Sequence, residues 1–67
     1  MKRKPIYYIQ NPQGRFLKSL GDNSIPVQWV RAEELEHARA FRNKSVAEFE
    51  IDITPELDGC VVLEHWN

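Results

Sequence analysis

A β-hairpin predicted near the start of the chain constrains the fold more than any other sequence feature. Residues 6–10 are rich in β-branched and aromatic side chains, and residues 15–20 form a second strand-like run. Between them, Asn11, Pro12 and Gly14 occupy the first, second and fourth positions that a type I turn favours. Pro12 presets φ, and Gly14 can adopt the left-handed conformation that closes the turn. The sequence therefore predicts two antiparallel strands here.

Two further strands are expected on either side of the middle of the chain. Residues 25–30 alternate apolar and other side chains after a loop at residues 21–24, which is the period of a strand. Because Pro26 cannot donate to a ladder, that strand starts late or lies at an edge. Residues 60–66 form the last predicted strand, and their apolar centre at residues 61–63 suggests cover on both faces.

Helix-forming residues dominate the segment from Arg31 to Arg42. Acids occupy its first turn, and Arg39 and Arg42 lie towards its end, which matches the helix dipole. Leu35, Ala38 and Phe41 would supply a narrow apolar stripe. The residue preferences therefore predict a helix over 31–42.

The segment that follows fits two structures. Ala47, Phe49, Ile51 and Ile53 alternate with acids as in a half-exposed strand, whereas Val46, Phe49 and Ile53 fall at helical spacing. The sequence leaves strand and helix open for residues 46–53. After it, Thr54 and Pro55 predict a single capped turn, and Asp58-Gly59 predicts another turn.

These elements predict one α+β domain spanning residues 1–67. We expect an antiparallel sheet of four to five short strands with one main helix packed on it, preceded by a flexible basic segment at residues 1–5. A chain of 67 residues buries only about 60% of the surface that its unfolded form exposes. The core must therefore be small.

Cysteine usage and the N-terminal sequence bear on compartment. A single cysteine, Cys60, excludes an internal disulfide, and together with two histidines it cannot complete a four-ligand zinc site without carboxylates. The basic residues at 2–4 are not followed by an apolar stretch long enough for export or for a membrane span. We therefore expect a cytoplasmic protein without a metal or other cofactor.

The charges of the chain are sorted by position. All nine Lys and Arg residues lie between Lys2 and Lys44, and four acids accompany them, so this part carries nine minus four, or +5. Residues 45–67 carry six acids and no Lys or Arg, or −6. Two parts of opposite sign attract each other, within one molecule or between two.

Catalytic chemistry finds little support. Cys60 could act as a nucleophile with His37 or His65 as its base, but a cysteine beside Val-Val-Leu is more often a buried apolar residue. In a strand, Cys60 and His65 point to opposite faces, which argues against a shared metal. The acids suit a solvated face, and no phosphate loop, nucleophile elbow or HExxH pattern is present. We expect no enzyme, no catalytic residue, no cofactor site and no metal ligand.

Nucleic-acid binding is the second function considered. Basic residues surround Tyr7, Tyr8 and Phe16, and such a sheet could combine phosphate neutralisation with base stacking. The basic residues in question are Lys2, Arg3, Lys4, Arg15 and Lys18. A pI near 6.1 and an acidic C-terminal third argue against a polyanionic partner. The simpler interpretation of the basic N-terminus is a solubilising tail.

A protein partner is the function that the residues favour. Small domains often complete their core by pairing with a copy of themselves, and interface centres are enriched in Trp, Tyr and Arg. Trp29 and Trp66 are the best candidate anchors, with Tyr7 and Tyr8 beside them. The alternative, in which both tryptophans fill the core of the monomer, stays open.

The order of motifs resembles a loose pattern in small uncharacterised bacteriophage and prophage proteins. The shared features are Tyr8-x-x-Asn11-x-x-Gly14-Arg15-Phe16-Leu17, Trp29, Ala38-Arg39-Ala40-Phe41, Ala47 and Asp58-Gly59-Cys60-Val61-Val62. The resemblance implies a compact ββ(β)αβ domain with a short strand at 38–41 and the helix nearer 45–53. It carries no catalytic residue. It implies a mobile-element or bacterial setting. Taken with the features that favour a protein partner, we expect a non-enzymatic accessory or adaptor protein of phage or prophage type that binds a host or phage protein, with a homodimer as one form.

Overall fold

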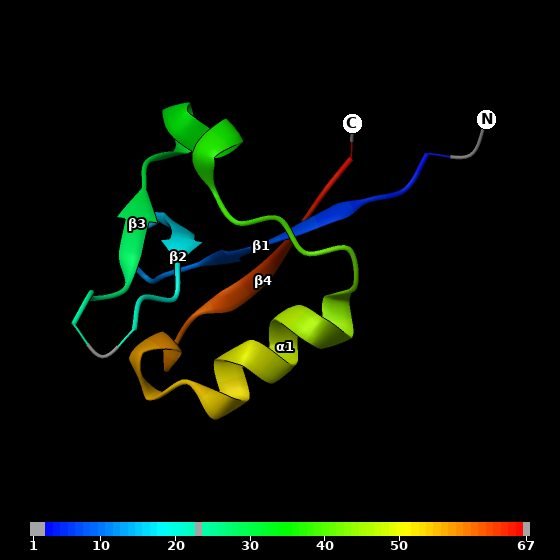
Figure 1. Cartoon of the computed structure of the whole chain (residues 1–67). Coiled ribbons are helices and arrows are strands. Elements are labelled where there is room, and N and C mark those ends of the chain that lie inside the picture. The colour runs from blue at the N-terminus through cyan, green and yellow to red at the C-terminus, as the bar shows by residue number, and fades with distance from the viewer. Residues whose placement is uncertain (1–2, 23, 67) are drawn as a thin grey trace.

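The structure is a computed structural model that describes residues 3–22 and 24–66. Within these residues, four short strands form one antiparallel sheet in the order β3-β2-β1-β4, and one α-helix packs on it (Figure 1). The α+β fold expected from the sequence is confirmed. The elements, in chain order, are β1 (Ile6–Gln10), β2 (Phe16–Ser19), β3 (Gln28–Val30), the 3₁₀ helix η1 (Ala32–His37), α1 (Lys44–Ile53), the 3₁₀ turn η2 (Pro55–Leu57) and β4 (Val61–His65).

The predicted hairpin is present between β1 and β2. The Gly14 N–H donates to the Asn11 carbonyl over 2.9 Å, and Gly14 has a φ of 85°. The Asn11 side-chain oxygen also accepts hydrogen bonds from the N–H groups of Gln13 and Arg15, at 3.1 and 2.8 Å. The turn is therefore held by the residue types from which it was predicted.

Strand β1 lies between β2 and β4 in the sheet. It pairs with β2 at one position only, Gln10 with Phe16, and the two strands diverge beyond it. A later segment enters the space between them. Tyr7 and Phe41 exchange two backbone hydrogen bonds of 2.8 Å, and the Arg39 N–H donates to the Leu17 carbonyl over 2.8 Å. The segment 39–41 therefore connects β1 to β2 where the two strands diverge.

The helix predicted over 31–42 is wrong. Only Ala32–His37 is helical, as η1, and Glu34 interrupts it with φ −111° and ψ 29°. Ala38 is extended, with φ −75° and ψ 153°. A helix continuing to Arg42 would use the Phe41 backbone groups that instead pair with Tyr7, and it would remove the Phe41 side chain from the core. Tertiary pairing overrides residue preference here.

The segment left open in the sequence is a helix, α1, over Lys44–Ile53. The helix position implied by the resemblance, near 45–53, agrees with α1, whereas the short strand implied at 38–41 is absent and only an isolated bridge joins Phe41 to Tyr7. Pro55 begins η2 as predicted, but the Thr54 side chain makes no capping hydrogen bond. Strand β3 starts at Gln28, after Pro26, and lies at one edge of the sheet, as the proline requires.

Two core clusters lie on opposite faces of the sheet. On one face, α1 and η2 place Ala47 and Leu57 against Ile9, Leu17 and Phe41. On the other face, Leu35 of η1 and Ala38 pack against a second cluster, formed by Tyr8, Phe16 and Val30. Because successive residues of β1 point to opposite faces, this strand contributes to both clusters.

The two oppositely charged parts of the chain meet in the sheet, because β1 pairs along its whole length with β4. In the part of the chain that the structure describes, no ion pair joins Arg3 or Lys4 to Glu64. The Tyr7 hydroxyl donates to Glu64 Oε1 over 3.5 Å instead. Lys2 lies outside the described residues, and the segment predicted as flexible, 1–5, is described from Arg3 onwards. None of the described helices is both long and apolar enough to cross a membrane.

Candidate functional site

The outer edge of β4 is unpaired in the described part of the chain, and its register shows which backbone groups are free. Tyr7 directs its N–H and C=O to Phe41, so its neighbours Ile6 and Tyr8 direct theirs to β4. Tyr8 is opposite Leu63, and Ile6 is opposite His65. The backbone groups of the alternate residues of β4, 62 and 64, therefore point away from the sheet.

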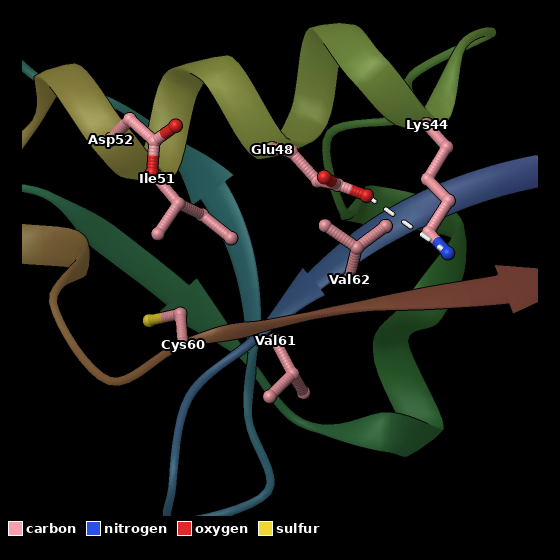
Figure 2. Close-up of a pocket in the computed structure, with 7 residues that line it drawn as sticks. All are labelled: Lys44, Glu48, Ile51, Asp52, Cys60, Val61 and Val62. Atoms are coloured by element: carbon pink, nitrogen blue, oxygen red, sulfur yellow. Dashed lines mark ion pairs between the residues drawn. The ribbon is translucent and has the colours of Figure 1, made fainter.

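A groove of about 320 Å³ runs between this edge and α1. Lys44, Glu48, Ile51 and Asp52 line it from the helix, and residues 60–62 line it from the start of β4. Figure 2 shows Val62 pointing towards α1 and Val61 pointing away from it. The floor of the groove is therefore apolar, and its helical wall is charged.

The charge around the groove is mainly negative. Glu48 and Asp52 are exposed on the α1 wall, and Glu64 lies on the same face of β4 as Val62. Lys44, the one base among the described residues that line the groove, has its ammonium 3.9 Å from Glu48 Oε1. Burial and the Glu64 carboxylate raise the pKa of the Tyr7 hydroxyl, which therefore stays a hydrogen-bond donor to Glu64 at neutral pH.

The opposite face of β4 is apolar and open, which corrects the expectation that this strand is covered on both faces. Val61 is 56% exposed and Leu63 is 41% exposed. The strand lies at the edge of the sheet, and η1 covers the other half of that face, over β2 and β3. Strand β4 is thus an apolar edge strand without a lysine or proline to discourage pairing.

Helix α1 carries a second uncovered apolar surface. Val46, Phe49 and Ile53 follow one another at helical spacing and are 46, 58 and 56% exposed. Ala47, on the side of the helix that faces the sheet, is fully buried. We call these three exposed residues the α1 stripe.

The aromatic residues proposed as interaction anchors separate into two groups. Trp66, which follows β4, is 56% exposed. Trp29 and Tyr7 are half-buried against the core cluster beneath α1, and Tyr8 is buried on the opposite face. Of the proposed anchors, Trp66 is therefore the one with a largely free surface, whereas Trp29 packs partly against the core.

The basic residues proposed for nucleic acid are exposed but lie apart, and Lys2 is outside the described residues. Arg3 and Lys4 precede β1, Arg15 lies in the turn beyond its other end, and Lys18 lies on β2. The rings of Tyr8 and Phe16 pack edge-to-face at 6.0 Å inside the core. Base stacking on these two rings would therefore require the core to open.

The thiol of Cys60 lies away from both histidines. His65 projects from the opposite face of β4, with its ring 5.9 Å from that of Tyr8, and His37 lies beside Glu36 at 3.8 Å on η1. Burial, with a smaller contribution from the negative charge of Asp58, raises the pKa of the Cys60 thiol. No group of three metal-ligating side chains is found among residues 3–22 and 24–66.

The raised pKa of Cys60 predicts that its thiol is alkylated slowly in the folded protein. At neutral pH the folded protein should react with iodoacetamide more slowly than the same chain unfolded in urea, because less thiolate is present. The rate should increase as the pH is raised through the elevated pKa. Mass spectrometry of the alkylated fraction over time measures it. A folded-state rate equal to or above that of the unfolded chain would show an activated thiol and contradict this interpretation.

The groove could not be predicted from the sequence, because a strand lies at an edge only by virtue of the strand order in the folded sheet. One local signal was available, since Lys44, Glu48 and Asp52 are spaced four residues apart and so share one side of a helix.

Comparisons of this chain with protein-family models, with curated proteins and with solved structures found no match.

Proposed function

We propose that this protein is a non-enzymatic accessory or adaptor protein of phage or prophage type that acts by binding another protein. The observation that carries the proposal is the amount of large apolar surface that the fold leaves open. Among the described residues, seven large hydrophobic side chains are 41 to 58% exposed, and six of them lie beyond residue 45, on α1, β4 and Trp66. They form separate patches, since the α1 stripe lies on the helix and Val61 points away from α1 on the other face of β4 (Figure 2). Exposed apolar patches on a small domain are typical of interaction sites.

The composition of this surface supports a protein partner over a nucleic acid. Interface centres are enriched in aromatic residues such as Trp and Phe, whereas nucleic-acid sites need clustered Lys and Arg. Trp66 and Phe49 belong to the exposed apolar set. The residues beyond Lys44 carry acids and no Lys or Arg, which a polyanion would avoid.

A pull-down from bacterial lysate with matched variants tests the proposal. Phe49→Gln removes the centre of the α1 stripe and Trp66→Ala removes the exposed tryptophan, while Glu33→Gln on η1 serves as a surface control. We expect one specific protein that the wild type and Glu33→Gln retain equally. We expect at least one of the two other variants to retain it about tenfold less, as at interface anchors. Circular dichroism should show the same melting behaviour for all four proteins.

Two results would contradict this function. One is a set of retained proteins that none of the variants changes. The other is retention on immobilised DNA that falls steeply between low and physiological salt, since this dependence would identify phosphate neutralisation and favour the nucleic-acid alternative.

A further inference from the structure

We propose that the groove between α1 and β4 binds an extended segment of the partner protein that alternates basic and apolar residues. The segment adds to the free edge of β4 as a fifth strand. This inference rests on the proposed function, because it names the chemistry of the partner segment and the place where it binds. It uses the groove and the β4 edge and does not need the α1 stripe.

The backbone of β4 supplies the first part of the recognition. The N–H and C=O groups of residues 62 and 64 point outwards, because those of Leu63 and His65 are used by β1. No bulge interrupts the register between β1 and β4, so the free edge is regular over Val61–His65. A strand added to such an edge gains main-chain hydrogen bonds whatever its sequence.

The two faces of β4 require different side chains from the added strand. On the face towards α1, the strand meets Glu48, Asp52 and Glu64 above the apolar floor formed by Ile51 and Val62. Lysine and arginine suit this face, since their stems pack on apolar surface while their charged ends reach the carboxylates. On the other face, apolar side chains would cover Val61 and Leu63. Alternation of basic and apolar residues follows from the pleat.

Charge selects this occupant over a second copy of the chain. Two β4 edges that pair about a two-fold axis present the same surface to each other, so Glu48, Asp52 and Glu64 of both copies would gather along one seam. Lys44, which lines the groove, already lies beside Glu48. Like charges facing each other across strands destabilise the pairing, whereas a basic segment neutralises them.

Amide hydrogen exchange followed by NMR provides the direct test, and it needs no variant. The probe is an acetylated, amidated hexapeptide that alternates valine and lysine, and the control probe has glutamate in place of each lysine. In the free protein we expect the amides of Val62 and Glu64 to exchange much faster than those of Leu63 and His65. The lysine peptide should slow exchange at Val62 and Glu64, and the glutamate peptide should not.

Three results of the exchange measurement would overturn the proposal. The first is that the lysine peptide, at saturation, leaves exchange at Val62 and Glu64 unchanged. The second is that both peptides protect the two amides equally. The third is that the two amides are protected without peptide, and more strongly at higher protein concentration, which would assign the edge to a second copy.

Matched substitutions test the two parts of the recognition separately. Glu64→Pro removes an outward N–H without removing a hydrogen bond to β1, and Glu64→Ala removes the same carboxylate but keeps the N–H. We expect the alanine variant to bind the lysine peptide about threefold more weakly than wild type, as for an exposed ion pair. The proline variant should bind about fivefold more weakly still, as for one lost main-chain hydrogen bond. Equal affinities of the two variants would exclude strand addition.

Removal of acidic or basic charge from the groove should change the affinity for the lysine peptide in opposite directions. Glu48→Gln with Asp52→Asn should weaken binding of the lysine peptide by about tenfold, whereas Lys44→Gln should strengthen it by about threefold, since it frees Glu48. Affinities from calorimetry that do not respond to either change would contradict the proposed partner chemistry.

The pull-down separates this inference from the proposed function. If Phe49→Gln or Trp66→Ala reduces retention of a specific protein in the pull-down while the peptide tests fail, only this inference is wrong. If the pull-down finds no specific protein, the proposed function itself fails.

Discussion

Replacement of Leu57 by alanine is expected to lower the free energy of unfolding by about 2 to 5 kcal/mol, the usual cost of a fully buried leucine. Leu57 has no exposed surface and belongs to the core cluster that holds Ile9 and Leu17. A domain of this length has only a few kcal/mol of total stability. The variant should therefore populate the unfolded state substantially at room temperature.

The size of this effect follows from the position of η2 between α1 and β4. Leu57 is the single fully buried residue of that turn, and it is surrounded by side chains from β1, β2 and α1. Its replacement removes three carbon atoms and leaves a cavity that these elements can close only by shifting together. The groove beside η2 should lose its shape with the same change.

Ile53→Ala is the matched control, because it also removes three carbon atoms, but from an exposed side chain at the end of α1. Ile53 ends α1 and is 56% exposed, and alanine forms helices better than isoleucine. We expect a change in unfolding free energy below about 0.5 kcal/mol in either direction. Urea denaturation followed by tryptophan fluorescence measures both variants. Equal costs for Leu57→Ala and Ile53→Ala would contradict the core described for this protein.

Elements that depend on neighbouring residues could be predicted from the sequence. The hairpin was predicted because Asn11, Pro12 and Gly14 determine their turn locally, and the structure shows the expected hydrogen bonds. The late start of β3 followed in the same way from Pro26. In both cases the deciding interaction lies within a few residues in the chain.

Two segments whose structure depends on distant residues were predicted wrongly or left open. The segment up to Arg42 has strong helix preference, but pairing of Phe41 with Tyr7 ends the helix early. Alternating acids made residues 46–53 resemble a strand, but the segment is a helix that buries Ala47 in the core cluster with Ile9. Residue preferences contribute only a few tenths of a kcal/mol per residue, so burial in the core outweighs them.

The candidate site was hidden for the same reason. The tryptophans were indistinguishable as anchors in the sequence, because burial of Trp29 depends on where β3 pairs. The free edge of β4 depends on its pairing with β1, more than fifty residues earlier in the chain. The separation of charge left pairing within one molecule and between two molecules open. The two ends of the chain do lie together, but through the backbone ladder between β1 and β4.

The largest effect expected from a single methyl group is that of Gly21→Ala, for which we expect a loss of about 3 kcal/mol or more of unfolding free energy. Gly21 has a φ of 73°, where an alanine costs about 1 to 2 kcal/mol. The added Cβ would also meet the carbonyl oxygen of Ile25 and lie 2.8 Å from that of Pro26. Both obstacles are backbone atoms, so no side-chain rotation relieves them.

The loop around Gly21 is closed by hydrogen bonds that prevent it from moving aside. The Asp22 N–H donates to the Ile25 carbonyl over 2.8 Å, the same oxygen that the new methyl group would meet. The Asp22 carboxylate accepts hydrogen bonds from the N–H groups of Ser24 and Ile25, at 2.9 and 3.0 Å, and these bonds lower its pKa. Relief of the clash would break these bonds and displace Pro26, which leads into β3.

Gly14→Ala separates the two causes, because Gly14 has a similar φ of 85° but open space beside it. The nearest atom to an added Cβ there is the side-chain nitrogen of Gln10, at 4.0 Å. We expect this variant to lose only the backbone strain, about 1 to 2 kcal/mol. The difference between the urea midpoints of the two variants then measures the clash at Gly21. If the two alanines cost the same, the close approach of Ile25 and Pro26 to Gly21 is not a feature of the folded protein in solution.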